Sequence, residues 1–211
     1  METIQTCKDM VKEIYEQFDA SHDWQHIERV WKNAMDILKD EPEADPFTVQ
    51  LAVLLHDVSD PKYSGDEGKK KEDEVLNRLD LSDLQKTQIK SIIQSVSFNG
   101  GNEQEARTIE EKIVRDADRL DAIGAIGIAR TFAYGGAKGR KLYDLEEVAR
   151  TSMTEEEYRS KETASVTHFY EKLLLLKELM TTRKGKQLAE ERHSFMVSFL
   201  QQLMKEVDGT I

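Results

Sequence analysis

The sequence is poor in cysteine, in signal-like segments and in long apolar runs. Cys7 is the single cysteine among 211 residues, which excludes an internal disulfide. The longest apolar stretches, such as Leu173 to Leu176, are far shorter than the roughly 20 residues that a membrane-spanning helix needs. The first residues, Met1 to Gln5, carry no signal-peptide pattern. We therefore expect a cytoplasmic protein that makes no membrane contact.

Clustered basic residues are scarce as well. The formal net charge is −11, and no stripe of Lys and Arg stands out along the chain. Binding along a nucleic-acid backbone depends on such a stripe, so we expect no nucleic-acid partner. A small anionic ligand stays compatible with the sequence if positive charge gathers locally.

The abundant residues indicate a helical globular protein. Hydrophobic residues make up 38% of the chain and charged residues 34%, which is typical of a folded protein and not of a disordered one. A length of 211 residues suits a single domain, 1–211, with a real core. Only three prolines are present, which favours helices.

Apolar residues recur at helical spacing almost throughout, as Ile27, Val30 and Trp31 illustrate, and no convincing alternating strand is found. Asp23 is a candidate cap for the second helix, and Asp45 followed by Pro46 is a start signal for the third. We predict an all-α bundle of about eight helices. The predicted ranges are 3–19, 24–40, 46–58, 68–80, 83–97, 106–134, 163–182 and 185–207.

Two polar segments interrupt this pattern, Asp60 to Glu74 and Gly135 to about Glu162. Either can act as a mobile flap over a site.

Gly124 and Gly127 form a separate feature. They could mark a phosphate-binding loop, but they lack the preceding strand and the spacing of a dinucleotide-binding motif. Close packing between helices is the favoured use.

Four residues with metal-binding side chains stand out: His26, the pair His56 and Asp57, and Asp118. Two imidazoles and two carboxylates can hold a borderline or hard divalent cation and leave coordination positions free for water and substrate. Each residue taken alone also has a structural interpretation. A histidine near a helix start is often a cap or a satisfied core group, and the aspartates from Asp116 to Asp121 also fit a solvated helix start.

The order and context of these residues resemble the HD-domain superfamily of metal-dependent phosphohydrolases, whose motif is His, then His-Asp, then a distant Asp. The matching stretches are His26 to Val30, Leu54 to Asp57, and Asp116 to Leu120. The resemblance implies a helical bundle with His26, His56, Asp57 and Asp118 as metal ligands. It selects Asp118 over Asp116 and Asp121, because the ligand directly precedes a basic residue in that family.

A narrower resemblance, from about residue 20 to 205, is to the bacterial YpgQ-like branch of nucleotide pyrophosphohydrolases. It rests on the stretches Asp23 to His26, Asp118 to Gly127, and His168 to Leu174. Two-metal HD phosphodiesterases place further histidines between the His-Asp pair and the last aspartate, and this chain has none there. One divalent cation is therefore expected, with Mn2+ preferred and Mg2+, Co2+ or Ni2+ as alternatives.

The resemblance also implies an acidic catalytic residue. Asp60 follows Asp57 by three positions, where related hydrolases place a carboxylate that orients or deprotonates the attacking water. We expect Asp57 and Asp60 to take part in catalysis. As an alternative, Asp60 is a turn residue before Pro61, a position that Asp fills readily.

Cationic side chains are needed to bind the phosphates of a substrate. We expect Lys62 first, then Arg119 and Arg130. A structural salt bridge competes for Arg119. His168 and Lys172, four positions apart, share a helical face and are further candidates. His22 is a candidate for substrate binding or for supporting a ligand, although it also fits a residue of the turn before a helix.

The expected function is hydrolysis of (deoxy)nucleoside triphosphates between the α and β phosphates, which gives a monophosphate and pyrophosphate. The enzyme alternative is a monophosphatase or phosphodiesterase that acts on nucleotides at the same site. The non-enzyme alternative is a nucleotide sensor whose metal only holds the helices together. A homodimer is compatible with the amount of apolar helix surface.

Overall fold

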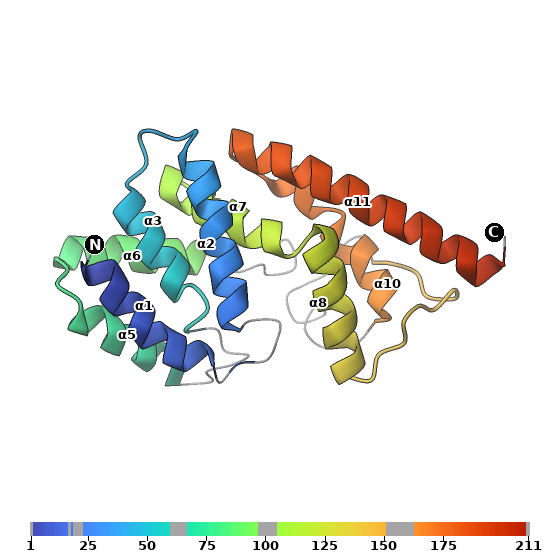
Figure 1. Ribbon diagram of the computed structural model, residues 1–211, viewed down its shortest axis with the longest axis horizontal. Coiled ribbons are helices and arrows are strands. Elements are labelled where there is room, and N and C mark those ends of the chain that lie inside the picture. Colours follow the sequence, from blue (N-terminus) through green and yellow to red (C-terminus); the bar gives the residue numbers. More distant parts are fainter. Residues whose placement is uncertain are drawn as a thin grey trace. The chain divides into compact units, whose positions relative to one another are not determined.

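The protein is described from a computed structural model (Figure 1). The described residues are 2–16, 18, 23–59, 67–96, 105–150 and 163–209. All regular structure in these ranges is helical, and none of it is strand, so the prediction of an all-α fold is confirmed. No helix in the described ranges has the length and apolar character to cross a membrane.

The chain divides into two compact units. The first comprises residues 1–97 and 104–118, and the second comprises residues 98–103 and 119–211. The boundary falls inside one helix, directly after Asp118. The single domain that we expected over 1–211 stays a prediction.

In the first unit, α3 is the central helix. Its middle residues are almost all apolar and buried, which is typical of a helix covered on every side. It packs against α1, α2 and α6 (Figure 1). The helices of this unit are α1 (Glu2–Tyr15), α2 (Trp24–Leu38), α3 (Pro46–Leu55), α5 (Gly68–Arg78), α6 (Asp83–Val96) and most of α7 (Ile109–Asp121).

Both predicted helix caps are confirmed. The Asp23 carboxylate accepts a hydrogen bond from the backbone N–H of His26 at the start of α2. The Asp45 carboxylate caps α3, and Pro46 is the first residue of that helix. The predicted end of α3 at residue 58 is wrong, because the helix stops at Leu55 and residues 56–59 form a turn. The predicted end of the first helix at residue 19 is also wrong, since α1 ends at Tyr15.

Helix α7 is fixed in the first unit at several points. Thr108 and Glu111 cap its start reciprocally, because each side chain accepts a hydrogen bond from the other residue's backbone N–H. Further along, Arg115 Nε donates to the carbonyl oxygen of Ser95 on α6 at 2.9 Å. Asn33 on α2 donates through Nδ2 to the carbonyl oxygen of Ala117 at 3.0 Å. The backbone next to Asp118 is therefore held from α2.

In the second unit, α8 packs against α11 and α10. Phe132 on α8, Phe199 on α11 and Phe169, which follows α10, form a cluster with ring centroids 5.9 to 6.3 Å apart. The elements are α8 (Gly124–Ala137), α10 (Ser165–His168), the π-helix η2 (Phe169–Leu173), the 3-10 helix η3 (Leu176–Leu179) and α11 (Arg183–Asp208). The single helix that we expected over 163–182 is wrong, because three helix types follow one another there.

The predicted helix 106–134 is also wrong. The helix is interrupted at Ala122 and Ile123, between α7 and α8. Helix α8 then begins at Gly124, which has a φ of 75°. Gly127 allows the following turn to lie against this corner, since a Cβ atom there would be 2.2 Å from the Ala122 carbonyl oxygen. The expected close backbone approach thus exists, but at the corner between α7 and α8.

The two polar segments are only partly described. Residues 60–66 and 151–162 lie outside the described ranges, whereas α5 begins at Gly68 and α8 continues to Ala137. The expected role of these segments as flaps stays a prediction.

Replacing Gly127 with Ala tests the corner between α7 and α8. We expect Gly127→Ala to lower the thermal midpoint, with a cost of about 1–3 kcal/mol, because the added methyl group meets a backbone carbonyl that cannot rotate away. Gly136→Ala on the same helix is the matched control. Its Cβ meets nothing within 4 Å, and Ala favours a helix over Gly. A Gly127→Ala protein as stable as the Gly136→Ala control would contradict this account.

Candidate metal centre

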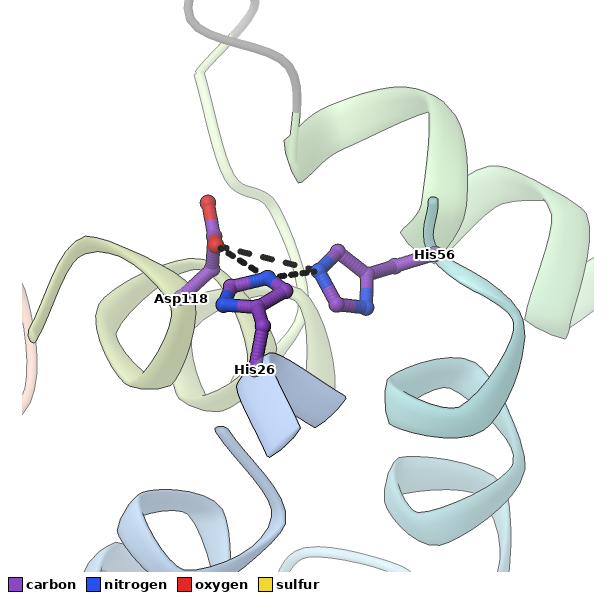
Figure 2. Close-up of side chains that lie close together, drawn as sticks. All are labelled: His26, His56 and Asp118. Atoms are coloured by element: carbon purple, nitrogen blue, oxygen red, sulfur yellow. Dashed lines mark hydrogen bonds and ion pairs between the residues drawn. The ribbon is translucent and has the colours of Figure 1, made fainter. Parts of the chain in front are cut away.

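Two histidines approach each other from different helices. His26 lies in the first turn of α2, and its position there is set by the Asp23 cap. His56 directly follows α3. Their Nε2 atoms face each other at 3.4 Å (Figure 2). Both side chains are only 1% exposed.

The tautomer of neutral His56 follows from its other ring nitrogen. Nδ1 lies 2.8 Å from the carbonyl oxygen of Val53. A carbonyl oxygen can only accept a hydrogen bond, so Nδ1 carries the proton. In the neutral ring, the lone pair of Nε2 is then directed at His26, as a metal ligand requires.

Two carboxylates complete the cluster. Asp57 Oδ2 lies 3.3 Å from His26 Nε2 and 3.5 Å from His56 Nε2. Asp118 Oδ1, from α7, lies 3.5 Å and 3.7 Å from the same two nitrogens (Figure 2). One ligand atom from each of His26, His56 and Asp118 lies within 4.8 Å of the other two. The four residues named from the sequence are thus neighbours in space, within the first unit.

The electrostatics of the cluster favour a cation. Burial lowers the pKa of His56, but the negative charges of Asp57 and Asp118 and a hydrogen bond with Asp118 outweigh burial and raise this pKa to about 9. Burial raises the pKa of Asp118, and the two histidines outweigh it and lower that pKa. Two buried imidazoles next to two carboxylates fit a divalent cation of borderline or hard character.

The carboxylates of the cluster are more exposed than its imidazoles. The side chain of Asp57 is 13% exposed and that of Asp118 is 31% exposed, whereas both histidines are buried. Solvent therefore reaches the carboxylates and not the imidazoles. This accessibility is typical of catalytic metal sites, which keep a coordination position open, and not of closed structural sites.

The aspartates near Asp118 have different surroundings. Asp116 is completely buried. Asp121 belongs to the second unit and forms an ion pair with Arg130, with 2.7 Å between Oδ2 and the guanidinium nitrogen. Asp118 is the aspartate of this stretch that lies beside both imidazoles, with Oδ1 3.5 Å from His26 Nε2 and 3.7 Å from His56 Nε2.

The expected substrate-binding residues are placed unevenly. Arg119 donates to the carbonyl oxygen of Leu179 at 2.6 Å, and the guanidinium of Arg130 pairs with Asp121, so both side chains have structural contacts in the second unit. His168 ends α10 and Lys172 lies in η2, and both are partly exposed. His22, Asp60 and Lys62 lie outside the described residues. The roles of all these residues stay predictions.

Asn33 is a supporting residue that the sequence interpretation did not single out. It is buried on α2 among Val30, Ala34 and Ile37, and it holds the carbonyl of Ala117, the residue before Asp118. Helix α2 thus carries His26 and also fixes the backbone that carries Asp118. A polar residue on the apolar face of a predicted helix is the sequence signal that would have found it.

Known proteins are similar to this chain in sequence and in fold. A model of the HD domain family matches residues 23–123. The uncharacterized protein YpgQ of Bacillus subtilis (strain 168) is 40% identical over 204 residues, which cover 94% of this chain and 91% of YpgQ. A solved structure of an HD-superfamily hydrolase from Bacillus thuringiensis is 43% identical with a TM-score of 0.76, and the match covers 98% of this chain and 97% of that one.

A solved structure of Bacillus subtilis YpgQ in complex with ADP aligns with a TM-score of 0.73 and 33% identity, over 96% of this chain and 98% of that one. The helical fold, the order of the four residues in the chain and their meeting in space agree with these similarities. The chain therefore belongs to the HD-domain family and is an HD-superfamily hydrolase of the metal-dependent phosphohydrolase type.

Proposed function

We propose that this protein is a nucleotide pyrophosphohydrolase that cleaves (deoxy)nucleoside triphosphates between the α and β phosphates. The observation that carries the proposal is the buried cluster of His26, His56 and Asp118, with Asp57 beside it. A related protein has been solved with ADP, which supports a nucleotide as the ligand class. The proposed products are a nucleoside monophosphate and pyrophosphate.

The proposed cofactor is one divalent cation, with Mn2+ preferred and Mg2+, Co2+ or Ni2+ as alternatives, held by His26, His56, Asp57 and Asp118. When bound, such a cation lowers the pKa of a water molecule and neutralises charge on phosphoryl oxygens. The chain contributes the geometry. Val53 keeps the proton of His56 on Nδ1, and Asp118 is the most exposed of the four side chains.

Further residues have proposed roles in the reaction. Asp60 directly follows the turn that carries His56 and Asp57, and we assign it the orientation or deprotonation of the attacking water. Lys62 is the first choice for binding the departing phosphates, with His22, His168 and Lys172 as additional candidates. Arg119 and Arg130 are weaker choices, because a substrate would compete with their contacts to Leu179 and Asp121.

Two alternative functions would use the same metal site, and they differ from the proposed one in the products that would form. A monophosphatase or phosphodiesterase would use the same metal site on another phosphate bond. A nucleotide sensor would hold its metal in a closed coordination shell and would show no turnover. The 31% exposure of the Asp118 side chain favours an open, catalytic site over a sensor.

A homodimer is part of the proposal, and sedimentation would test it independently.

The products identify the bond that is cleaved. With Mn2+ and a panel of ribo- and deoxyribonucleoside tri-, di- and monophosphates, we expect 31P NMR to show pyrophosphate and a nucleoside monophosphate from triphosphates. Orthophosphate as the only inorganic product would refute α-β cleavage and favour the monophosphatase. Stoichiometric metal binding without any turnover would favour the sensor.

Metal binding should depend on pH through His56. In the metal-free protein the pKa of His56 is raised from 6.5 to about 9, so the proton stabilises the folded state below pH 6.5 and this contribution is lost as the pH rises toward 9. A bound cation must displace that proton. We expect Mn2+ affinity to increase from pH 6.5 to 9, with roughly one proton released per ion.

Calorimetric titrations in buffers of different ionisation enthalpy would measure this proton release. The thermal midpoint of the metal-free protein should fall over the same pH range. His193→Ala is the control, because His193 lies on α11 in the second unit. A metal affinity that does not change between pH 6.5 and 9 would contradict the role given to His56.

A further inference from the structure

The last carbonyl groups of α3 have an unusual set of partners. In a continuing helix, the carbonyls of Val53, Leu54 and Leu55 would accept from the N–H groups four residues later. Here Val53 instead accepts from the ring nitrogen of His56, and Leu55 accepts from the N–H of Val58, three residues on. The carbonyl of Leu54 accepts from the hydroxyl of Tyr15 at 3.0 Å.

The main chain of Asp57, in the same turn, lies near the Tyr15 hydroxyl. The hydroxyl of α1 therefore meets the chain beside Leu55 and His56. Its bond to Leu54 takes the place of a hydrogen bond of the next helical turn. It lets the backbone leave the helix directly after Leu55, so that His56 and the adjacent Asp57 both reach His26 Nε2.

The ring of Tyr15 is held in place by packing. The residue is completely buried. Its ring contacts Phe18 edge-on, with centroids 5.4 Å apart, and lies 6.5 Å from the ring of Trp24. Trp24 is the first residue of α2, two positions before His26. Tyr15 thus touches the start of the helix that carries His26 and the end of the helix that precedes His56.

The Tyr15 hydroxyl is buried and donates to a backbone carbonyl, so its contribution to the site is geometric.

We propose that Tyr15 is a positioning residue for the metal centre, and that its hydroxyl sets the backbone turn that presents His56 and Asp57. The proposal rests on the proposed metal-binding role of that pair. A buried tyrosine that served only the core would contribute through its ring, and loss of the oxygen would leave the metal affinity unchanged.

The test is Tyr15→Phe in the full chain, which keeps the ring and removes one oxygen. We expect Mn2+ affinity, measured by EPR of free Mn2+, to fall about 10- to 100-fold, as for other residues that support metal ligands. Activity should fall at limiting Mn2+ and recover in part at high Mn2+. The matched control is Val11→Ala, which removes buried methyl groups from the same helix. It should lower the thermal midpoint and leave the Mn2+ affinity unchanged.

The outcomes separate the positioning role of Tyr15 from the proposed metal site. If the wild type binds Mn2+ and Tyr15→Phe binds it equally well, the positioning role is refuted and the proposed metal site stands. If the wild type binds no Mn2+, both are refuted.

A measurement on the wild type covers the case in which Tyr15→Phe does not fold. NMR should show a slowly exchanging hydroxyl proton on Tyr15, held by the carbonyl of Leu54. A hydroxyl proton that exchanges rapidly would overturn that hydrogen bond and the positioning role with it.

Discussion

The structure of the first unit depends on bringing two buried imidazoles and two carboxylates to one point. His26 Nε2 and His56 Nε2 are 3.4 Å apart in a region where both side chains are 1% exposed. Polar groups buried in this way need partners. Asp57 and Asp118, the more exposed pair, provide negative charge, and a divalent cation would satisfy all four groups together. Helices α2, α3 and α7 must therefore hold these four side chains in accurate positions.

Backbone contacts around the cluster provide that placement. The Asp23 cap fixes the first turn of α2, and Asn33 on the same helix holds the carbonyl of Ala117. Near the end of α3, the Tyr15 hydroxyl donates to the carbonyl of Leu54, and the His56 ring bonds to the carbonyl of Val53. Buried polar groups are satisfied here mainly by bonds between side chain and backbone. Such bonds orient ligands, which is the contribution that a protein makes to metal-assisted hydrolysis.

Much of the fold could be predicted from the sequence. The all-α fold and the caps at Asp23 and Asp45 follow local rules that the structure obeys. The break before Gly124 was missed, because apolar residues recur at helical spacing across it and a glycine with positive φ has no distinct pattern. The contact of Tyr15 with Leu54 joins residues 39 positions apart. Only the tertiary fold brings these two residues together, so no local pattern contains that contact.

The central claim is that His26, His56, Asp57 and Asp118 hold one catalytic cation. The most direct measurement is the number of Mn2+ ions bound per chain, by EPR, in the wild type and in His56→Ala and Asp57→Ala, together with turnover of a nucleoside triphosphate. We predict one ion in the wild type, and joint loss of the ion and of turnover in both variants, by roughly 100-fold or more. His193→Ala should behave as the wild type does. Retained Mn2+ binding and turnover in both His56→Ala and Asp57→Ala would contradict the account.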